Sequence, residues 1–515
     1  MKGTERVLVF DIGTQSTRAL LVTPRGEITA KAQKGHHPAY ISKQSGWAEQ
    51  WPDFYYEQIC RVARQLKENF PEEFAAVKAV TVTTIRSTSI CLDAEKKPLR
   101  PALLWLDQRR ASGEPKMHPL ASAAIKAVGM EKTMQLQYQK AHCNWIRESE
   151  PEIWAKTDKY VLLGTYLNYR LTGRLADSTA AIVGYVPYDF KHRCWKKKND
   201  IVRPVFDLPD DMMCELVDPG TCIGTLTGEA AKDLGLPDTM PLIACGTDKA
   251  CEILGLGCVD KRCAAFSFGT TATVTFTTDQ YLEPERFIPA YDSILPGCYT
   301  PEIEIFRGYW LISWFKQEFA QKEVMEALEH HVQPEELLNQ RLKEVPPGCN
   351  GLILQPYFTP NVTMPEAKGA AIGLSDAHTR IHLYRAIIEG INFALMDGMR
   401  HMEKRGGFRF EEIRVGGGGA QSREICQITA DMFGLPVVKT QTHEVAGIGS
   451  AIPAFVSLGV FADYKEALAS MVHPKETFHP DQRQHQIYRR LYEEVYKQIY
   501  PKLVDIYKKI SELSV

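Results

Sequence analysis

The first strands and the turn between them constrain the fold of this chain most. Residues 7–10 are an apolar run that ends at Asp11, residues 13–17 read Gly-Thr-Gln-Ser-Thr, and residues 19–22 are a second apolar run. A further turn and a short third strand over residues 24–30 complete a predicted antiparallel meander. Backbone N–H groups in a small glycine-containing turn can approach an anion closely, and hydroxyls add donors. The pattern therefore predicts a phosphate-binding turn, with an ordinary hairpin as the alternative.

Asp11, at the end of the first predicted strand, is a candidate ligand of Mg²⁺. That ion prefers oxygen ligands and keeps several water molecules, so a single carboxylate can help to hold it. The turn after Asp11 is not a P-loop, because it contains no lysine and leads into a strand rather than a helix.

The same design returns in the second half of the chain. Residues 264–268 predict a strand, Gly269, Thr270 and Thr271 form the turn, and residues 272–276 predict the next strand. Two such turns, one in each half, indicate a duplicated domain with a phosphate-binding turn in each copy. A chain of 515 residues is also too long for one core. We therefore predict an N-terminal domain over residues 1–252 and a C-terminal domain over residues 253–515.

A carboxylate stands at a predicted strand-to-helix junction. The apolar residues 240–245 lead into Gly246, Thr247 and Asp248, and a helical pattern follows over residues 249–255. One interpretation makes Asp248 the N-cap of that helix. The other makes it a general base that takes a proton from a hydroxyl in a cleft. The two roles are compatible.

Candidate ligand contacts are spread over the N-terminal half. Trp47 and Glu49 lie in an aromatic loop before a predicted helix, and Arg86 and Asp107 lie at the ends of apolar strands, where ligand-binding side chains often occur. Tyr138 lies among polar neighbours in a helical region. The alternatives are aromatic packing for Trp47, surface salt bridges for Arg86 and Asp107, and a surface tyrosine at position 138.

A run of four glycines precedes a predicted helix near the C-terminal end. Residues 416–419 follow a strand, but Gln421 or Ser422 occupies the place of the third glycine of a dinucleotide-binding fingerprint. Such a loop still allows a flat or anionic ligand to approach the backbone, and a tight connection without a ligand is the alternative.

Two further regions are predicted to be helical. Residues 117–185 should be largely helix, broken at Pro151 and Gly173. Near the end of the chain an amphipathic helix should bury an apolar stripe, with four tyrosines running beside it. The predicted stripe consists of Ile487, Leu491, Val495, Ile499 and Leu503.

Composition narrows the class of protein. The net charge of -2 gives no general electrostatic reason to bind nucleic acid or an anionic membrane. No apolar stretch reaches transmembrane length, and no signal peptide is visible. The thirteen cysteines contain no Cys-x-x-Cys pair, which disfavours structural zinc and favours free thiols in a reducing compartment. We therefore expect a cytoplasmic protein.

In their order along the chain, these motifs resemble those of the FGGY carbohydrate kinases, a family that shares the duplicated ribonuclease-H-like fold of actin and the chaperone ATPases. The resemblance runs from Phe10 to about Gly459. The matching segments are 11–18 (first phosphate motif), 46–50 (substrate-side loop), 105–109 (Trp-x-Asp-x-Arg), 246–248 (catalytic aspartate), 268–271 (second phosphate loop), 369–374 with 382–390 (second signature), 416–431 (adenosine segment) and 444–451 (closing helix entry).

The resemblance implies an α/β protein with two ribonuclease-H-like domains flanking an interdomain cleft. It also implies transfer of a phosphoryl group from ATP, with Mg²⁺, to a hydroxyl of a ketose or polyol such as xylulose, ribulose or glycerol, with a primary hydroxyl expected. A homodimer is common among relatives.

The resemblance also assigns roles to residues. Asp248 would be the catalytic base and Asp11 the metal ligand. The implied substrate contacts are Arg86, Trp47, Glu49, Asp107 and Tyr138. The implied nucleotide contacts are Gly13, Thr14, Gln15, Ser16, Thr17, Gly269, Thr270, Thr271, Gly417, Gly418, Gly419 and Ser422.

Departures from the family pattern fall in the predicted substrate pocket. His142 stands where the first signature has the lysine of Lys-x-x-Trp, and residues 85–88 replace the Gln-Met-His-Gly of many xylulose kinases. Arg86 matches an arginine of glycerol kinases, but Ser87 replaces the glutamate beside it. The sugar therefore stays open. The alternatives to a kinase are a nucleotide-dependent ATPase of the actin or chaperone type and a catalytically silent sugar sensor.

Overall fold

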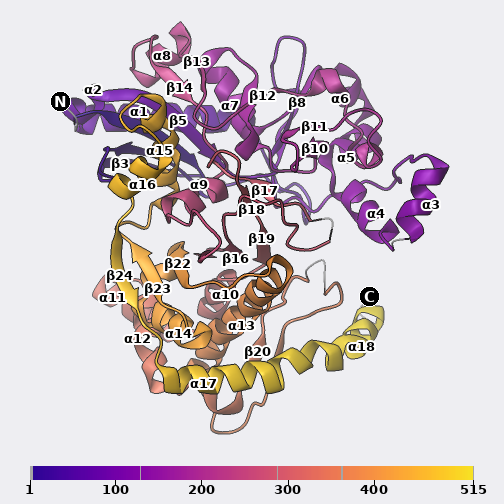
Figure 1. The fold of residues 1–515 in the computed structure, drawn as a ribbon, viewed down its shortest axis with the longest axis vertical. Coiled ribbons are helices and arrows are strands. Elements are labelled where there is room, and N and C mark those ends of the chain that lie inside the picture. The colour runs from indigo at the N-terminus through magenta and orange to yellow at the C-terminus, as the bar shows by residue number, and fades with distance from the viewer. Residues whose placement is uncertain (1–3, 128, 287, 361–363, 514–515) are drawn as a thin grey trace. The chain divides into compact units, whose positions relative to one another are not determined.

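The structure is a computed structural model that describes residues 4–127, 129–286, 288–360 and 364–513. Its chain divides into two compact units (Figure 1). Unit 1 contains the residues up to Gly257 together with Tyr291–Tyr299 and Ala446–Val472, and unit 2 contains Cys258–Ala290, Thr300–Val445 and the residues from His473 onward.

The central sheet of unit 1 has six strands. Their order is β13 (Cys222–Thr225), β14 (Pro241–Ile243), β5 (Val77–Thr84), β1 (Arg6–Ile12), β2 (Ser16–Val22) and β3 (Ile28–Gly35). Strands β1, β2 and β3 form the predicted antiparallel meander, and β5 runs parallel to β1. Because β1 is buried on both faces, its apolar residues form a continuous run instead of alternating with polar ones.

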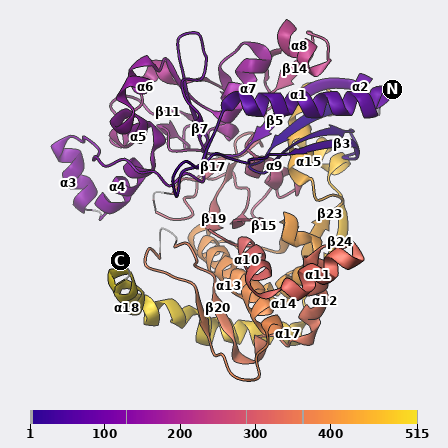
Figure 2. The ribbon, with the colours of Figure 1, turned by 180° about the vertical axis from the view of Figure 1, so that it is seen from behind.

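Helices cover both faces of this sheet. Figure 2 shows α1 (Pro52–Asn69) and α7 (Leu163–Thr172) on the side that faces the viewer. On the other face, α9 (Asp248–Gly255), α15 (Val445–Ser457) and α16 (Tyr464–Met471) bury their apolar side chains against Val7, Val9 and Leu20. The chain from 446 onward thus contributes to the core of unit 1.

The rest of unit 1 is built on the edge that carries the predicted substrate residues. A second sheet has the order β4 (Glu49–Gln50), β7 (Ala102–Leu103), β6 (Ser89–Leu92) and β8 (Lys159–Leu162). The remaining elements are α2 (Pro71–Ala75), α3 (Pro119–Ala127), α4 (Glu131–Lys140), α5 (His142–Ser149), α6 (Pro151–Lys156), β9 (Ala176–Ser178), β10 (Tyr188–Asp189), β11 (Cys194–Trp195), β12 (Glu215–Val217), α8 (Gly228–Leu234) and β17 (Tyr291–Asp292). The predicted helical region 117–185 therefore also contains the strands β8 and β9, which the sequence analysis missed because both are short.

The central sheet of unit 2 repeats this design. Its order is β19 (Glu302–Ile305), β16 (Ala272–Thr275), β15 (Cys263–Phe268), β22 (Glu412–Gly416), β23 (Val437–Thr440) and β24 (Pro474–Phe478). As in unit 1, a Gly-Thr turn joins the first two strands as an antiparallel pair, and the next strand joins the sheet in parallel. The predicted duplication is confirmed.

The core of unit 2 is organised by the long helix α13 (Arg380–Gly406), which is buried along most of its length. Around it pack α10 (Trp310–Phe319), α11 (Gln321–His330), α12 (Pro334–Gln340), α14 (Arg423–Phe433), α17 (Gln482–Arg490) and α18 (Lys497–Leu513), with β20 (Ile353–Gln355) and β21 (Ala370–Ile372) beside them.

The tail is helical as predicted, and part of the predicted stripe is buried: Ile499 lies in the core of unit 2, and Leu491 and Leu503 pack partly buried against it. Ile487 and Val495 are each 40% exposed, whereas Tyr488, Tyr492 and Tyr496 are buried. The ring centroids of Tyr496 and Phe393 of α13 lie 4.9 Å apart. A π-helical turn over residues 491–496 lies within this stretch.

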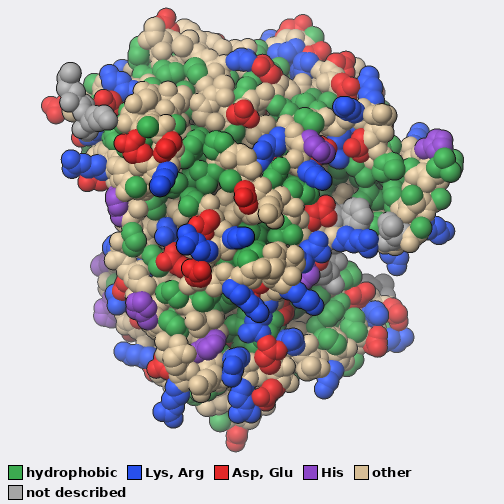
Figure 3. Space-filling view, in the orientation of Figure 1, with side chains coloured by type: hydrophobic (Ala, Val, Ile, Leu, Met, Phe, Trp, Pro, Cys, Tyr) green, Lys and Arg blue, Asp and Glu red, His purple; other side chains and the backbone are tan. Residues whose placement is uncertain are grey.

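Charged side chains of both signs are interspersed over the face of the molecule in Figure 3. No helix of the described residues is both long and apolar enough to cross a membrane.

Candidate active site

The first phosphate turn is a tight loop held by a buried histidine. The N–H of Gly13 donates to the carbonyl of Ser16 at 3.0 Å. His36, on the chain just after β3, lies beneath the turn with Nδ1 3.0 Å from the carbonyl of Thr14 and Nε2 2.9 Å from Oγ1 of Thr17. A carbonyl can only accept, so Nδ1 carries the proton and Nε2 accepts from the threonine hydroxyl. Burial lowers the pKa of His36, which keeps the imidazole in this neutral form.

Asp11 is buried at the end of β1, next to that turn. It faces Arg18 across the β1–β2 hairpin, and Arg18 Nη1 lies 2.9 Å from Asp11 Oδ2. Among the described residues there is no group of three or more His, Cys, Asp or Glu side chains that could hold a metal. Mg²⁺ could therefore be held here by the single carboxylate of Asp11 together with phosphate oxygens and water.

Asp248 occupies the first turn of α9, and the cap is its neighbour. Thr247 Oγ1 accepts from the N–H of Ala250 at 3.3 Å, so the capping role predicted for Asp248 belongs to Thr247. A threonine preceding the aspartate is an equally good cap, which is why the sequence pattern assigned the role one residue too late. The carboxylate of Asp248, thereby relieved of capping, is half-buried, and its Oδ1 accepts from the N–H of Lys249 at 2.8 Å.

The surroundings of Asp248 raise the pKa of its carboxyl above the usual value. Burial raises the pKa of its carboxyl to about 6, and the negative charge of Asp11 acts in the same direction. The positive charges of Arg86 and Lys249 act in the opposite direction and limit the rise. The fold of unit 1 thus brings three predicted site residues, Asp248, Arg86 and Asp11, into one electrostatic cluster. A carboxylate tuned in this way is suited to general-base catalysis.

Arg86 lies in the bend between β5 and β6. Its guanidinium carbon is 5.0 Å from the ring centroid of Tyr291 in β17. The next residue, Ser87, has φ of 50°, and its N–H donates to the carbonyl of Val183 at 2.9 Å. This left-handed residue turns the chain sharply and sets the direction in which Arg86 leaves the sheet.

Glu49 and Asp107 belong to a buried network of charges instead of the surface salt bridge that was the alternative for Asp107. Glu49 Oε1 lies 2.6 Å from Arg100 and 2.9 Å from Arg109. Asp107 accepts from the N–H of Ala48 at 2.8 Å and from Arg109 Nη2 at 2.6 Å. Although burial favours its protonated form, the hydrogen bonds from Arg109 and Ala48 hold the pKa of Asp107 below its usual value.

Trp47 lies over this network. The guanidinium carbon of Arg109 is 4.1 Å from the centroid of the Trp47 ring and 4.6 Å from that of Trp145. The network therefore fixes the aromatic face of Trp47, while the two carboxylates are engaged with arginines. Arg109 was visible in the sequence as part of the Trp-x-Asp-x-Arg motif, but its central place in the network was not predicted.

Trp105 is a second residue of this motif for which no role was predicted. Its side chain is 37% exposed, and its indole N–H donates to Oγ1 of Thr14 at 2.9 Å. This bond joins the loop that carries Asp107 to the first phosphate turn. The signal that could have revealed it was the tryptophan at the head of the same motif.

Tyr138 is buried on α4, so the interpretation as a surface tyrosine is wrong. Its hydroxyl donates to Oε1 of Glu148 on α5 at 2.9 Å. Burial and this carboxylate both raise the pKa of Tyr138. Helical spacing in α4 places Tyr138 inward, and the polar residues around it in the sequence lie on the other sides of the helix. A sugar contact at this position stays a prediction.

In unit 2 the second phosphate turn lies beside the glycine run. The carbonyl of Gly269 accepts from the N–H of Tyr309 at 3.1 Å, and that of Thr270 from Trp310 at 3.4 Å. A Cβ on Gly419 would lie 2.5 Å from the ring of Tyr309, and a Cβ on Gly417 would lie 2.8 Å from the carbonyl carbon of Phe268. Glycine is needed at both positions because the loop packs closely on Phe268 and Tyr309. A Cβ on Gly418 would meet no atom within 4 Å, so the exposed backbone at Gly418 faces open space.

Ser422 begins the helix that follows the glycine run. Its Oγ accepts from the N–H of Ile425 at 3.2 Å and thus caps α14. Glycine-containing turns and helix N-termini bind phosphate in many proteins, so each of these segments, taken by itself, could contact a nucleotide.

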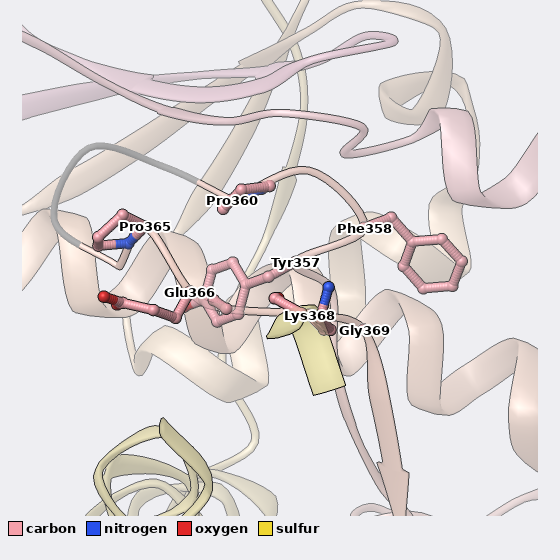
Figure 4. A pocket seen from close by; sticks show the side chains of 9 residues that line it. Tyr357, Phe358, Pro360, Pro365, Glu366, Lys368 and Gly369 are labelled. Carbon is pink, nitrogen blue, oxygen red and sulfur yellow. The ribbon is translucent and has the colours of Figure 1, made fainter. Parts of the chain in front are cut away.

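A pocket of about 480 Å³ lies elsewhere in unit 2, away from the predicted residues. Figure 4 shows side chains that line it, among them Tyr357, Phe358, Glu366 and Lys368. The carboxylate of Glu366 accepts from the hydroxyl of Tyr500 at 2.9 Å. We assign this pocket no role in the reaction.

Comparison with known proteins identifies the family. Sequence models of the N-terminal and C-terminal domains of the FGGY family of carbohydrate kinases match residues 6–255 and 264–458. The chain belongs to the FGGY family. As an FGGY carbohydrate kinase it is a phosphotransferase with an alcohol group as acceptor, and kinases of this family use ATP as phosphate donor.

Similar proteins cover nearly the whole FGGY kinase chain. The xylulose kinase of Lactococcus lactis is 25% identical over 99% of this chain and 97% of its own, and that of Bacillus subtilis is 26% identical over 95% of each. The crystal structure of ligand-bound xylulose kinase from Lactobacillus acidophilus superposes with a TM-score of 0.83 at 20% identity, covering 98% of this chain and 100% of that one. The predicted two-domain α/β fold of the sugar kinases is confirmed.

Proposed function

We propose that this kinase transfers the terminal phosphoryl group of ATP to a hydroxyl, expected to be primary, of a ketose or polyol, with Asp248 as the general base. Xylulose is the first candidate, because the Lactococcus lactis and Bacillus subtilis relatives that span nearly the whole chain are named xylulose kinases, while an L-fuculokinase of Escherichia coli covers 92% of it. The observation that carries the proposal is the position of Asp248 in the first turn of α9, half-buried and with a pKa of about 6.

The base would work by orienting the acceptor hydroxyl and taking its proton. A pKa of about 6 leaves the carboxylate of Asp248 mostly ionised at neutral pH, yet basic enough to accept a proton as the hydroxyl reacts. Arg86 lies close enough to influence this carboxyl and is the best-supported substrate contact, since its guanidinium can donate hydrogen bonds to sugar oxygens.

The remaining substrate residues support two different roles. Trp47 offers an aromatic face to the C–H surface of a sugar. Glu49 and Asp107 are engaged with arginines, so we propose that they act by holding Arg109 beneath Trp47. Tyr138 would influence substrate binding indirectly, through the hydrogen bond that its hydroxyl donates to Glu148.

For the nucleotide we propose the two Gly-Thr turns, Gly13–Thr17 and Gly269–Thr271, as phosphate contacts. The adenosine would lie against Gly417, Gly418, Gly419 and Ser422, and Asp11 would help to hold Mg²⁺. When bound, ATP supplies the phosphoryl group, and Mg²⁺ offsets the negative charge of its phosphates. In this proposal residues 1–252 serve the substrate and the first phosphate turn, and residues 253–515 serve the nucleotide.

The same proposal places the protein in the cytoplasm, where ATP is made and used. The thirteen cysteines are free thiols, as expected of a protein from a reducing compartment. A homodimer stays a prediction.

The test is a coupled assay of ADP release across pentuloses, hexuloses, polyols and sugar acids. A kinase of the proposed kind turns over rapidly with one group of these acceptors and slowly without any. If the chain were instead a nucleotide-dependent ATPase of the actin or chaperone type, ADP release would be slow and no sugar would stimulate it.

Asp248→Asn tests the base. We expect kcat to fall by about 10²–10⁴, because positioned proton transfer contributes that much, while calorimetry still detects sugar binding. The matched control is Glu229→Gln, because Glu229 also lies in the first turn of a threonine-capped helix, α8, and is exposed. Full activity of Asp248→Asn would refute the base, and a sugar-binding chain without turnover in either form would be a sensor.

A further inference from the structure

Two thiols lie almost within bonding distance at the start of unit 2. The Sγ atoms of Cys258 and Cys263 are 2.6 Å apart, and both side chains are buried. A disulfide bond measures about 2.03–2.05 Å, so only a small movement separates this contact from a covalent link. Neither cysteine belongs to the proposed reaction site, and both are free thiols.

Hydrogen bonds of the surrounding loop hold the two sulfur atoms in this arrangement. Oγ1 of Thr277 donates to the carbonyl of Cys258 at 2.6 Å. The N–H of Cys263 donates to the carbonyl of Asp260 at 3.3 Å, and Oδ1 of Asp260 accepts from the N–H of Arg262 at 2.9 Å. Cys263 then begins β15, whose register with β22 fixes its backbone. These hydrogen bonds hold the loop of residues 258–263 in place whether or not a disulfide forms.

A cation lies beside the sulfur pair. Arg414 projects from β22, and the two thiols contribute to the rise in its pKa, which shows that its guanidinium is near both. Burial and the neighbouring sulfur raise the pKa of Cys258, and the charge of Arg414 opposes that rise. The carboxylate of Glu412, which lies 2.7 Å from Arg414 Nε, adds to the rise and partly offsets the effect of the arginine. A positive charge favours the thiolate, the form that attacks a disulfide.

We propose that Cys258 and Cys263 form a reversible disulfide by exchange with a low-molecular-weight disulfide such as oxidised glutathione. The thiolate of Cys263, the less deeply buried of the two, attacks one sulfur of the small disulfide and releases one small thiolate. The thiolate of Cys258 then attacks the Cys263 sulfur of the mixed disulfide and releases the second small thiolate. The two cysteine protons pass to the two released thiolates, so two protein thiols are oxidised and one small disulfide is reduced to two thiols.

Access to the pair runs through an exposed loop. Val259, between the two cysteines, is 37% exposed, and Lys261 and Arg262 are exposed as well. A local opening of these residues is enough to admit a small disulfide. Intracellular disulfides are typically transient and redox-sensing, and a pair of neighbouring thiols is the arrangement such sites use.

Another pair of cysteines provides an internal comparison. Cys245 and Cys251 in unit 1 interact with each other, and both are buried. The pKa of Cys245 is lowered, chiefly by its hydrogen bond with Cys251, although burial and the carboxylate of Asp177 act in the opposite direction. This pair differs from Cys258 and Cys263 in access, because none of the residues between Cys245 and Cys251 is exposed. We expect this pair to stay reduced where Cys258 and Cys263 oxidise.

The experiment incubates the whole protein with oxidised glutathione, blocks free thiols with an alkylating agent in acid, and maps the peptides by mass spectrometry without reduction. We expect a Cys258–Cys263 link that dithiothreitol removes, returning two alkylatable thiols. Cys194 and Cys222 are exposed and should take up glutathione, which shows that the oxidant was active. Glutathione on these two with Cys258 and Cys263 still alkylated would overturn the proposal.

Single variants separate the two steps. In Cys258→Ser the mixed disulfide of Cys263 with glutathione should accumulate, because the resolving thiol is missing. In Cys263→Ser, Cys258 should stay reduced, since it is fully buried and no longer has a partner that reacts first. Arg414→Gln should slow formation of the link and Arg414→Lys should preserve its rate. An equal rate of link formation in wild type and Arg414→Gln would remove Arg414 from the mechanism, and glutathione on Cys258 in Cys263→Ser would contradict the assigned order of attack.

Discussion

At the scale of single residues, the environment of Asp248 is the feature that turns a common helix-start residue into a candidate base. Thr247 caps α9, so the carboxylate of Asp248 is not needed as the helix cap. Burial and the charge of Asp11 raise its pKa, and Arg86 and Lys249 keep the rise moderate. The pattern Gly-Thr-Asp does not show the influence of Asp11 or Arg86, since these residues lie far from Asp248 in the sequence.

The pKa of Asp248 predicts the pH dependence of the reaction. The active form of a base is the deprotonated one, so kcat/KM for the sugar should rise with pH through an apparent pKa near 6 and then level off. Steady-state rates between about pH 5 and 8 with saturating ATP provide the measurement. Arg86→Ala removes a nearby positive charge and should move the same inflection to higher pH. A flat profile in the wild type would contradict the role of Asp248.

At the scale of elements, the first phosphate turn depends on a residue that lies outside it. His36 follows β3 and holds both ends of the turn through Thr14 and Thr17. The three strands of the meander thus cooperate, because β3 delivers the histidine that shapes the turn between β1 and β2.

His36→Ala should loosen the turn without unfolding the sheet. Loss of the two hydrogen bonds of the imidazole corresponds to roughly 1–3 kcal/mol, so we expect kcat/KM for ATP to fall by about 5–150-fold. Sugar binding measured by calorimetry should change little. His37→Ala is the control, since His37 is the exposed neighbour. Unchanged ATP kinetics in His36→Ala would show that the turn holds its shape without the imidazole.

The terminal helices offer a second test at this scale. Tyr496 is buried against Phe393, whereas its neighbour Val495 is 40% exposed. Tyr496→Ala should therefore lower the free energy of unfolding by about 3–5 kcal/mol. Val495→Ala should change it by no more than about 0.5 kcal/mol. Chemical denaturation of both variants makes the comparison, and the reverse order would restore the stripe that the sequence pattern favoured.

The elements show what the sequence could and could not reveal. The turns at 13–17 and 269–271 were predictable, because their glycine, hydroxyl and strand patterns are local. The buried face of the tail was predictable only in part, since its tyrosines pack on α13 and the apolar spacing does not show this contact. The same holds for Tyr138, Arg109 and His36, whose partners lie on other elements. Local patterns therefore located the site, and tertiary contacts decided how each side chain is used.

At the scale of the whole molecule, sequence order and structural units differ. Residues 446–472 follow most of unit 2 along the chain, yet α15 and α16 complete the core of unit 1. All of α15 lies within the match to the C-terminal family model, which ends at residue 458. The stability of unit 1 should therefore depend on residues that a cut in the middle of the chain would remove.

Two phenylalanines test this dependence. Phe455 is fully buried in unit 1, and Phe315 is fully buried in unit 2. Either change to alanine should cost about 3–5 kcal/mol of stability. By hydrogen-exchange mass spectrometry, Phe455→Ala should speed exchange in β1 and β2, and Phe315→Ala should speed it in β15 and β16. Faster exchange of β15 and β16 in Phe455→Ala, with β1 and β2 unchanged, would refute the assignment of α15 to unit 1.

The return of residues 446–472 to unit 1 has a consequence for synthesis on the ribosome. The strands of the first sheet emerge early, but one face of that sheet is only partly covered, by α9, until α15 and α16 have left the exit tunnel, when most of the second sheet is already outside. Nascent chains expose such unfinished apolar surfaces to aggregation. Unit 1, most of which is translated first, is therefore completed late. Chaperones that act on nascent chains should engage it during most of the translation of this chain.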